Sequence, residues 1–356
     1  EAMDKLNQEK IPKEYDTQGM IRVLDRFPSQ CEEAIELSKN WDPPPIEGVD
    51  RVIICGMGGS AMAGEIARRF ARIPVFVNRG YTLPGFVDRH SLLVAVSYSG
   101  NTAETLSCLN QGIKRDIPAA CITSGGEAER IAAKNDISLL RIPSGYQPRA
   151  AMGWLALPLL SLFENIDVLN DLGGWEALID GLNKVRTGCT WDMPDDDNPA
   201  KQLAQTLFDK IPCIYGTVDN TDLVAMRWKT QINENAKQPA FWNVFPELNH
   251  NEILAMEHPS LMRTHSIVML KNNFDSAENR ARMEIMQGLF AERAIPVTQT
   301  MADGATELAQ ILSQIYLGDY VSLYLALLNG VDPTPVRLIE QFKRELAVRT
   351  ENSTGV

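Results

Sequence analysis

Three hydroxyl side chains lie close together in the segment Ser97-Tyr-Ser-Gly-Asn-Thr102, which follows an apolar run and precedes a helical pattern. Ser97, Ser99 and Thr102 can each donate and accept hydrogen bonds, and the first N–H groups of a helix lack partners within it. Together these groups suit a doubly charged phosphate monoester held at the positive end of a helix. The same pattern also fits a hydroxyl-rich turn in which Thr102 only caps the helix.

A second loop follows the apolar residues 51–55 and is rich in glycine: Gly56, Gly58 and Gly59. Glycine allows a tight turn and a close approach of backbone N–H groups to a ligand, and we expect Ser60 to cap a helix over residues 61–71. A tight turn without a ligand would have the same pattern. The spacing partly fits a dinucleotide fingerprint, but that fingerprint needs an acid about 20 residues later to hold a ribose. Asn78 and Arg79 stand there, which makes a nicotinamide dinucleotide the weaker hypothesis.

Three charged residues are candidates for proton transfer or charge stabilisation: Glu234, His250 and Arg149. A carboxylate can move a proton between adjacent carbons, and an imidazole titrates near neutral pH. Arg149 is the one charged residue between Arg141 and Glu164, where its guanidinium could stabilise a developing oxyanion. From the residues alone, each could also be an ordinary surface or capping side chain.

Strands and helices must alternate if these loops are to meet at one edge of a sheet. Short apolar runs predict strands at residues 52–55, 75–78, 91–96, 119–123 and 138–142, and again at 212–215, 240–245, 265–270 and 296–298. Helical patterns predict helices at residues 20–39, 61–71, 103–114, 128–135, 149–163, 201–208, 222–235, 276–293, 306–328 and 336–349, with one more beginning at residue 252. This alternation predicts an α/β fold with mostly parallel sheets flanked by helices.

The 356 residues accommodate two domains of ordinary size. The acidic, proline-containing segment 190–199 is typical of a linker. We therefore expect a helical lead-in over residues 1–50, a first domain over 51–190 that recognises phosphate, and a second domain over 191–356 that carries the base.

Composition narrows the possible partners. A formal net charge of −12 argues against nucleic acid, and we identify no apolar run of the roughly 20 residues that span a bilayer. The charged N-terminal residues do not resemble a signal peptide. The six cysteines form no CxxC pair, and the four histidines form no HxH or HExxH pattern. Buried, reduced thiols in a cytoplasmic protein without a metal are the favoured interpretation.

Four motifs occur in order: GMGGS, SYSGNTAET, NENAK and ELNHNEI, followed by DPTPV. In this combination the chain resembles the bifunctional phosphoglucose/phosphomannose isomerase family of the sugar-isomerase (SIS) domain superfamily, from Val52 to about Arg344. The first two motifs alone would indicate only the superfamily, whereas NENAK, ELNHNEI and DPTPV make the match narrow. The resemblance implies two SIS-type, flavodoxin-like domains and a homodimer with shared active sites. It also implies reversible conversion of glucose 6-phosphate or mannose 6-phosphate to fructose 6-phosphate through a cis-enediol, with neither cofactor nor metal.

The resemblance also assigns roles to residues by their positions in these motifs. Glu234 is the base, His250 opens the sugar ring from the partner subunit, and Arg149 stabilises negative charge. The residues that it assigns to substrate binding are Gly58, Gly59, Ser60, Ser97, Ser99, Thr102, Thr334 and Lys343. Either Glu247 or Glu252 could orient His250.

The alternative hypothesis is that the chain is a non-catalytic SIS regulator that binds a sugar phosphate. Such a protein would keep Ser97, Ser99 and Thr102 but would not need Glu234 or His250. The acidic net charge disfavours a regulator that binds DNA. An amidotransferase-linked synthase would need an N-terminal glutaminase half, for which the chain has no room.

Overall fold

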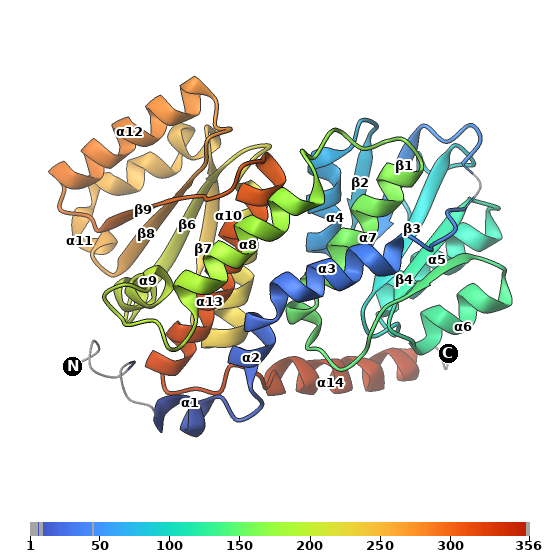
Figure 1. Ribbon diagram of the computed structural model, residues 1–356, viewed down its shortest axis with the longest axis horizontal. Coiled ribbons are helices and arrows are strands. Elements are labelled where there is room, and N and C mark those ends of the chain that lie inside the picture. Colours follow the sequence, from blue (N-terminus) through green and yellow to red (C-terminus); the bar gives the residue numbers. More distant parts are fainter. Residues whose placement is uncertain (1–5, 7–9, 45, 354–356) are drawn as a thin grey trace.

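The chain forms two α/β lobes, each built around its own parallel sheet (Figure 1). The computed structural model describes residues 6, 10–44 and 46–353. Within these residues the strands are β1 (Arg51–Cys55), β2 (Val75–Asn78), β3 (Ser91–Ser97), β4 (Ala119–Thr123), β5 (Ser138–Arg141), β6 (Ile211–Thr217), β7 (Phe241–Phe245), β8 (His265–Lys271) and β9 (Val297–Met301). This confirms the expected α/β class, and the strand predictions agree with the structure to within a few residues.

Both sheets have the same kind of strand order. The first sheet runs β2-β1-β3-β4-β5 and the second runs β7-β6-β8-β9. All strand pairs in both sheets are parallel. The order therefore reverses beside β1 in the first sheet and beside β6 in the second, as in flavodoxin-like folds. Ligands of such sheets bind outside the carboxyl ends of the strands at this reversal.

Helices surround both sheets and occupy the space between the lobes (Figure 1). The α-helices are α1 (Lys10–Tyr15), α2 (Met20–Asp25), α3 (Phe27–Ser38), α4 (Gly58–Phe70), α5 (Ala103–Lys114), α6 (Gly126–Lys134), α7 (Met152–Asn165), α8 (Trp175–Cys189), α9 (Pro199–Leu207), α10 (Asp222–Gln231), α11 (Pro259–Met262), α12 (Ala277–Glu292), α13 (Glu307–Leu328) and α14 (Arg337–Ser353). Shorter turns are η1 (Pro148–Ala150), η3 (Glu247–His250) and η4 (Glu252–Glu257), which are 3₁₀, and η2 (Ile232–Ala236), which is a π-helix.

One continuous apolar core joins the two lobes. It includes residues of β1 and β3 in the first sheet and of β6 and β8 in the second, together with α7 and α13. α7 packs against α3 and α4, while α13 packs against α8, α9 and α10. α8, which precedes residue 190, thus packs on a helix of the second lobe, and the boundary at residues 190 and 191 stays a prediction.

α13 is the described helix that is long and apolar enough to cross a membrane by length and composition. However, 94% of its apolar window is buried inside the protein, as expected for a core helix.

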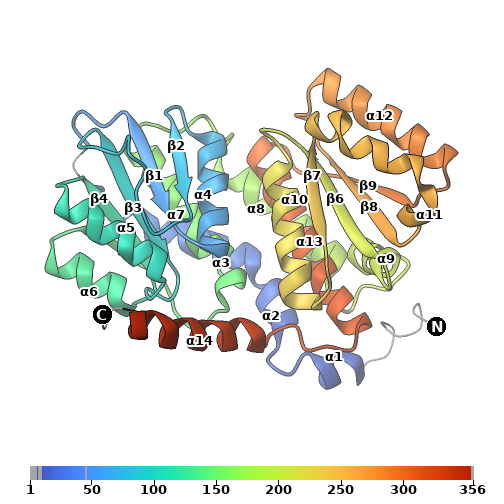
Figure 2. The same cartoon turned by 180° about the vertical axis from the view of Figure 1, so that it is seen from behind.

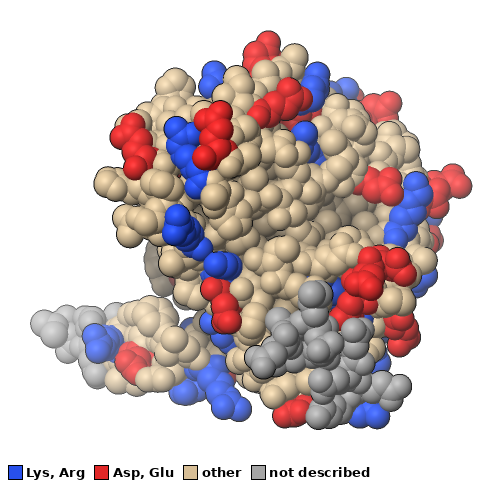
Figure 3. All heavy atoms as spheres, turned by 90° about the vertical axis from the view of Figure 1, so that its left-hand side faces the viewer, with Lys and Arg blue, Asp and Glu red and all other residues tan. Residues whose placement is uncertain are grey.

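The face that carries α11 and α12 is shown in Figure 3, where the described basic side chains are interspersed with acidic ones. No broad basic patch that would suit nucleic acid is formed by the described residues of this face.

α14 has a different environment from the other helices. It runs along one side of the molecule, below α2 and toward the end of α6, in both views (Figures 1 and 2). Its described side chains, from Arg337 to Thr350, are all exposed. Several of them are large and apolar: Leu338, Ile339, Phe342, Leu346 and Val348. The helix therefore buries no apolar face against its own chain.

Several helix predictions need correction. The single helix expected over residues 20–39 is two helices, α2 and α3, separated at Arg26; Pro28 lies in the first turn of α3, where proline is well tolerated. The expected helix from Glu252 is 3₁₀, and the helix expected over 222–235 ends at Gln231 and continues as the π-helix η2.

Candidate active site

The hydroxyl loop between β3 and α5 is held in part by hydrogen bonds among its own residues. Ser97 is buried, and its Oγ lies 2.9 Å from Thr102 Oγ1 and accepts a hydrogen bond of 3.1 Å from the Gly100 N–H. Thr102 is the N-cap residue of α5, but its side chain makes no capping bond. Because Thr102 bonds to Ser97 instead, the first N–H groups of α5 have no side-chain cap from it. The exposed Ser99 completes the loop.

Gly100 is the residue that allows this loop to pack against its neighbour. Its φ is +69°, and a Cβ on it would lie 1.7 Å from the carbonyl oxygen of Gly125. Asn101 also contacts the neighbouring loop, because its side-chain carbonyl accepts a 3.1 Å bond from the Glu127 N–H. Two loops at the carboxyl edge of the first sheet are thus fixed to each other.

The glycine loop between β1 and α4 lies beside the end of β3. A Cβ on Gly56 would meet the Val96 carbonyl oxygen at 3.1 Å, and a Cβ on Gly59 would meet the Pro148 carbonyl oxygen at 3.0 Å. Gly58 has a φ of +50°. The expectation that Ser60 caps a helix is wrong, because α4 already begins at Gly58 and Ser60 is a buried residue of its first turn. The glycines let the helix start earlier and closer to neighbouring backbone than the sequence suggested.

A small, largely enclosed pocket of about 200 Å³ lies between α4 and α10. It is lined by Gly58, Gly59, Met62, Arg79, Arg149, Met226, Arg227, Thr230 and Glu234. Four of the residues singled out in the sequence, far apart along the chain, therefore share one pocket: Gly58, Gly59, Arg149 and Glu234. Of the remaining lining residues, Arg79 was noted only as the residue in place of a ribose-binding acid.

Arg149 is buried and held in a fixed orientation. Its Nε donates to Asn235 Oδ1 at 2.6 Å, and its Nη2 donates to the carbonyl oxygens of Pro333 at 2.7 Å and Thr334 at 2.9 Å. Its Nη1 lies 3.7 Å from a carboxylate oxygen of Glu234. Burial lowers the pKa of Arg149, while the carboxylate of Glu234 counteracts that shift. A guanidinium stays charged under these conditions and can stabilise negative charge beside Glu234.

Arg227 fixes the backbone of Arg149 through a hydrogen bond. It donates to the Arg149 carbonyl oxygen and forms a buried ion pair with Asp319, with a shortest separation of 2.9 Å. Burial raises the pKa of Asp319, and Arg227 counteracts that rise. A buried pair with several hydrogen bonds fixes geometry, because neither partner has an alternative arrangement in the core.

Glu234 lies in the π-helix η2, with its side chain 32% exposed. Single turns of π-helix are frequent at functional sites. The next residue, Asn235, is buried and donates to Ser322 of α13 at 2.9 Å while accepting from Arg149. The turn thereby connects the carboxylate, the guanidinium and the core helix.

Lys237 is a residue of this region whose role the sequence did not suggest, although it ends the NENAK motif. It has a φ of +56°, and its Nζ donates to the carbonyl oxygens of Glu234 and Pro333, the latter at 3.1 Å. Partial burial, followed by repulsion from Arg149, lowers the pKa of Lys237 to about 8. Thr334, whose carbonyl oxygen accepts from Arg149, is buried. Its Oγ1 has no hydrogen-bond partner among the described residues.

His250 and Lys343 both lie outside this pocket. His250 is exposed at the end of η3, beyond the edge strand β7, and does not line the pocket. Lys343 is exposed on α14 and does not line it either. Glu252 bonds to Tyr215 and Asn243, and Glu247 accepts a 3.0 Å bond from Asn251, so the structure gives each acid a partner other than His250.

Comparison with known proteins identifies the family. The chain is 41% identical over 335 residues to a bifunctional phosphoglucose/phosphomannose isomerase of Caldicellulosiruptor bescii, covering 92% of this chain and 99% of that protein. A protein of the same name from Aquifex aeolicus is 34% identical, with coverage of 92% and 98%. This chain belongs to the bifunctional phosphoglucose/phosphomannose isomerase family. Residues 196–346 also match the family described as bacterial phospho-glucose isomerase C-terminal SIS domain.

Relatives with other names share the fold or part of the sequence. A D-glucosamine-6-phosphate 4-epimerase of Sulfolobus acidocaldarius is 33% identical over 66% of this chain and 72% of its own length. The C-terminal domain of a glucosamine-fructose-6-phosphate aminotransferase of Francisella tularensis superposes with a TM-score of 0.67 at 19% identity, covering 88% of this chain and 97% of that one. The latter likeness concerns the fold, and it supports the SIS-type architecture of the isomerase family.

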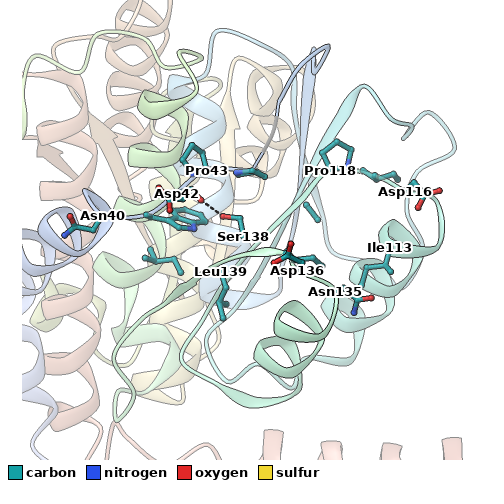
Figure 4. Close-up of a pocket in the computed structure, with 16 residues that line it drawn as sticks. Asn40, Asp42, Pro43, Ile113, Asp116, Pro118, Asn135, Asp136, Ser138 and Leu139 are labelled. Carbon is teal, nitrogen blue, oxygen red and sulfur yellow. Dashed lines mark hydrogen bonds between the residues drawn. The ribbon is translucent and has the colours of Figure 1, made fainter.

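An open hollow of about 920 Å³ at the opposite edge of the first sheet is a poor candidate for the site of this family (Figure 4). It lies at the amino ends of β4 and β5, and its lining includes Asp42, Asp116 and Asp136. The described lining contains no lysine, arginine or histidine. Such a hollow would repel an anionic substrate, and it lies at the edge opposite to the one where ligands of these sheets bind.

Proposed function

We propose that this protein interconverts glucose 6-phosphate or mannose 6-phosphate with fructose 6-phosphate. The observation that carries the proposal is the pocket in which Glu234 lies 3.7 Å from the fixed guanidinium of Arg149, beside Gly58 and Gly59. Membership of the bifunctional isomerase family supports the same reaction. A sugar phosphate is therefore the proposed substrate class.

Glu234 is the proposed base. It removes the proton from C2 of the open-chain aldose phosphate, and protonation of O1 gives a cis-enediol. Loss of the O2 proton and return of the carbon-bound proton to C1 then give the ketose. The reverse sequence forms the aldose, and return of the proton to either face of C2 would give either epimer. Arg149 stabilises the negative charge that develops on the enediol oxygens, because its orientation is fixed before the reaction begins. No cofactor or metal takes part in this proposed step.

The phosphate is proposed to rest on the hydroxyl loop. Ser97, Ser99 and Thr102 supply hydroxyl groups, and the start of α5 adds N–H groups with the positive end of a helix. Ser60 contributes from the first turn of α4. The strand-order reversal between β1 and β3, which flavodoxin-like sheets use for ligands, lies between these two loops.

We propose a homodimer whose partner subunit completes the site. His250, which would open the sugar ring, and Lys343 both lie outside the pocket of their own chain. The exposed apolar side chains of α14 would be buried by a second copy, as oligomer contacts commonly bury such surfaces.

Thr334, beside Arg149, is proposed to lie near C1 and C2 of the sugar. The six buried free thiols support a cytoplasmic location.

The test is incubation of the purified protein with fructose 6-phosphate in the presence of a chelator. We expect both aldose phosphates to form, and we expect Glu234→Gln to lower kcat by at least a hundredfold while the substrate still binds. Glu164→Gln, which changes an exposed carboxylate at the end of α7, is the matched control and should retain activity. Normal turnover by Glu234→Gln would show that another group is the base.

Two outcomes would favour other functions. Binding of sugar phosphates by an inert wild-type protein would favour the non-catalytic regulator. Glucosamine 6-phosphate belongs in the same assay, because a relative is named as a D-glucosamine-6-phosphate 4-epimerase. Turnover of that sugar alone would contradict the proposed substrates.

A further inference from the structure

Three arginines line the pocket, and one of them differs from the other two. Arg149 and Arg227 are buried, and backbone carbonyls and buried side chains hold their guanidinium groups. Arg79 has a side chain that is 40% exposed and pairs with Glu65 through one nitrogen, 2.8 Å from the carboxylate. Arg79 therefore has guanidinium N–H groups that can turn toward a ligand without breaking the core.

The place of Arg79 in the sheet relates it to the proposed phosphate loop. It follows β2 directly, whereas the hydroxyl loop follows β3, and β1 lies between these strands. The Gly56 N–H donates to the Asn78 carbonyl oxygen at 3.2 Å, which fixes the backbone before Arg79 to the glycine loop. Arg79 and the hydroxyl loop thus flank the glycine loop on opposite sides.

The separation of these two features suits an open-chain sugar phosphate. Two strand spacings correspond to about 9.6 Å. An extended six-carbon chain with a terminal phosphate spans about 9 Å from phosphorus to C1, judged from ordinary bond lengths. With its phosphate at the hydroxyl loop and its reacting carbons at Glu234, the molecule would end near Arg79.

We propose that Arg79 binds the C1 end of the open-chain substrate by donating hydrogen bonds to O1. The inference rests on the proposed function and adds a residue that sets how the reacting carbons lie against Glu234. The site should accordingly favour ligands with a negatively charged group at C1, since a charge-assisted bond to a guanidinium is stronger than a neutral one.

Arg68 provides a closely matched control. It pairs with the other carboxylate oxygen of Glu65 at 2.7 Å, and its side chain is 43% exposed. Arg68 does not line the pocket. Replacing either arginine removes one partner of Glu65, so the structural consequences should be similar, whereas loss of a ligand contact should follow only from Arg79→Ala.

The experiment compares the binding of two probes by calorimetry: 6-phosphogluconate, which carries a carboxylate at C1, and glucitol 6-phosphate, which carries an alcohol there. For Arg79→Ala we expect the Kd of 6-phosphogluconate to rise about ten- to a hundredfold, which corresponds to the loss of one hydrogen bond between charged groups. The Kd of glucitol 6-phosphate should rise less. Arg68→Ala should change both by less than about twofold, as for a weak exposed ion pair. Arg79→Lys should restore part of the affinity.

Activity measurements on the same variants separate this inference from the proposed function. Arg79→Ala should lower kcat/KM for fructose 6-phosphate while Arg68→Ala retains it. Equal effects of the two substitutions in an active enzyme would overturn the role of Arg79 and leave the proposed function intact. An inert wild-type protein whose binding of 6-phosphogluconate still depends on Arg79 would overturn the isomerase and keep the binding role.

Discussion

Arg149 shows how single residues set the geometry of the site. Its guanidinium is removed from water, which is costly, and the Asn235 side chain and two backbone carbonyls replace that water. The same bonds leave Nη1 facing Glu234. A lysine could not reproduce this arrangement, because an ammonium lacks the planar fork of donors.

The lowered pKa of Lys237 predicts a pH dependence of stability. The folded protein holds this proton with a pKa of about 8, against 10.5 in the unfolded chain. Below pH 8 both states are protonated, and the cost of holding the charge in the folded protein is fully present. Between pH 8 and 10.5 the unfolded state binds more protons at this residue than the folded state does. The free energy of unfolding should therefore increase as pH rises through this range.

The measurement is urea unfolding of the wild type and of Lys237→Met at several pH values from 7 to 10.5. The stability of the wild type relative to the variant should increase across the upper part of this range. Lys134→Met, an exposed lysine on α6, controls for general effects of charge removal. A difference that stays flat with pH would contradict the lowered pKa.

At the scale of elements, the π-helix η2 decides where the candidate base lies. α10 ends at Gln231, and the wider turn places Glu234 at the pocket while Asn235 points into the core. Asn235 bonds both Arg149 and Ser322, so it links the turn to η1 and α13. The orientation of Arg149 is thus a property of three elements together.

Asn235→Ala should therefore harm catalysis more than a neighbouring substitution in the same turn. Losing two buried hydrogen bonds should lower the free energy of unfolding by about 2–3 kcal/mol and release the guanidinium, with a fall in kcat/KM. Asn233→Ala is the matched control, because Asn233 makes a 2.8 Å bond to the Gln238 carbonyl and does not contact Arg149. Chemical denaturation and steady-state kinetics would measure both, and equal kinetic effects would argue against the role of Asn235.

At the scale of the whole molecule, α14 leaves large apolar side chains exposed on the single chain. A helix with Leu338, Phe342 and Leu346 at four-residue spacing has an apolar stripe, and that stripe faces solvent in the single chain. If a second copy covers it, the charged double variant Leu338→Asp/Phe342→Asp should produce monomers. Activity should fall with it, because the proposed site takes His250 from the partner.

Analytical ultracentrifugation with parallel activity assays would test this prediction. Ile285→Asp changes a similarly exposed apolar residue on α12 and should leave both the mass and the activity unchanged. A monomeric wild type, or a double variant that remains dimeric, would contradict the role given to α14.

The sequence by itself determined the strands, the fold class and the family. The runs at residues 91–96 and 120–123 are buried in the structure, and their apolar composition alone predicts that burial. The family followed from short motifs whose residue types and spacing are local properties of the chain.

Tertiary structure decided what depends on residues far apart in the chain. α4 begins at Gly58, whose φ is +50°, and a Cβ on the next residue, Gly59, would meet the Pro148 carbonyl oxygen at 3.0 Å. Ser60 therefore lies within the first turn of the helix and does not cap it. The place of Arg79 in the pocket depends on a strand order that brings β2 beside β1. The exposure of α14 and the separation of His250 and Lys343 from Glu234 depend on how the whole chain packs, which no local pattern encodes.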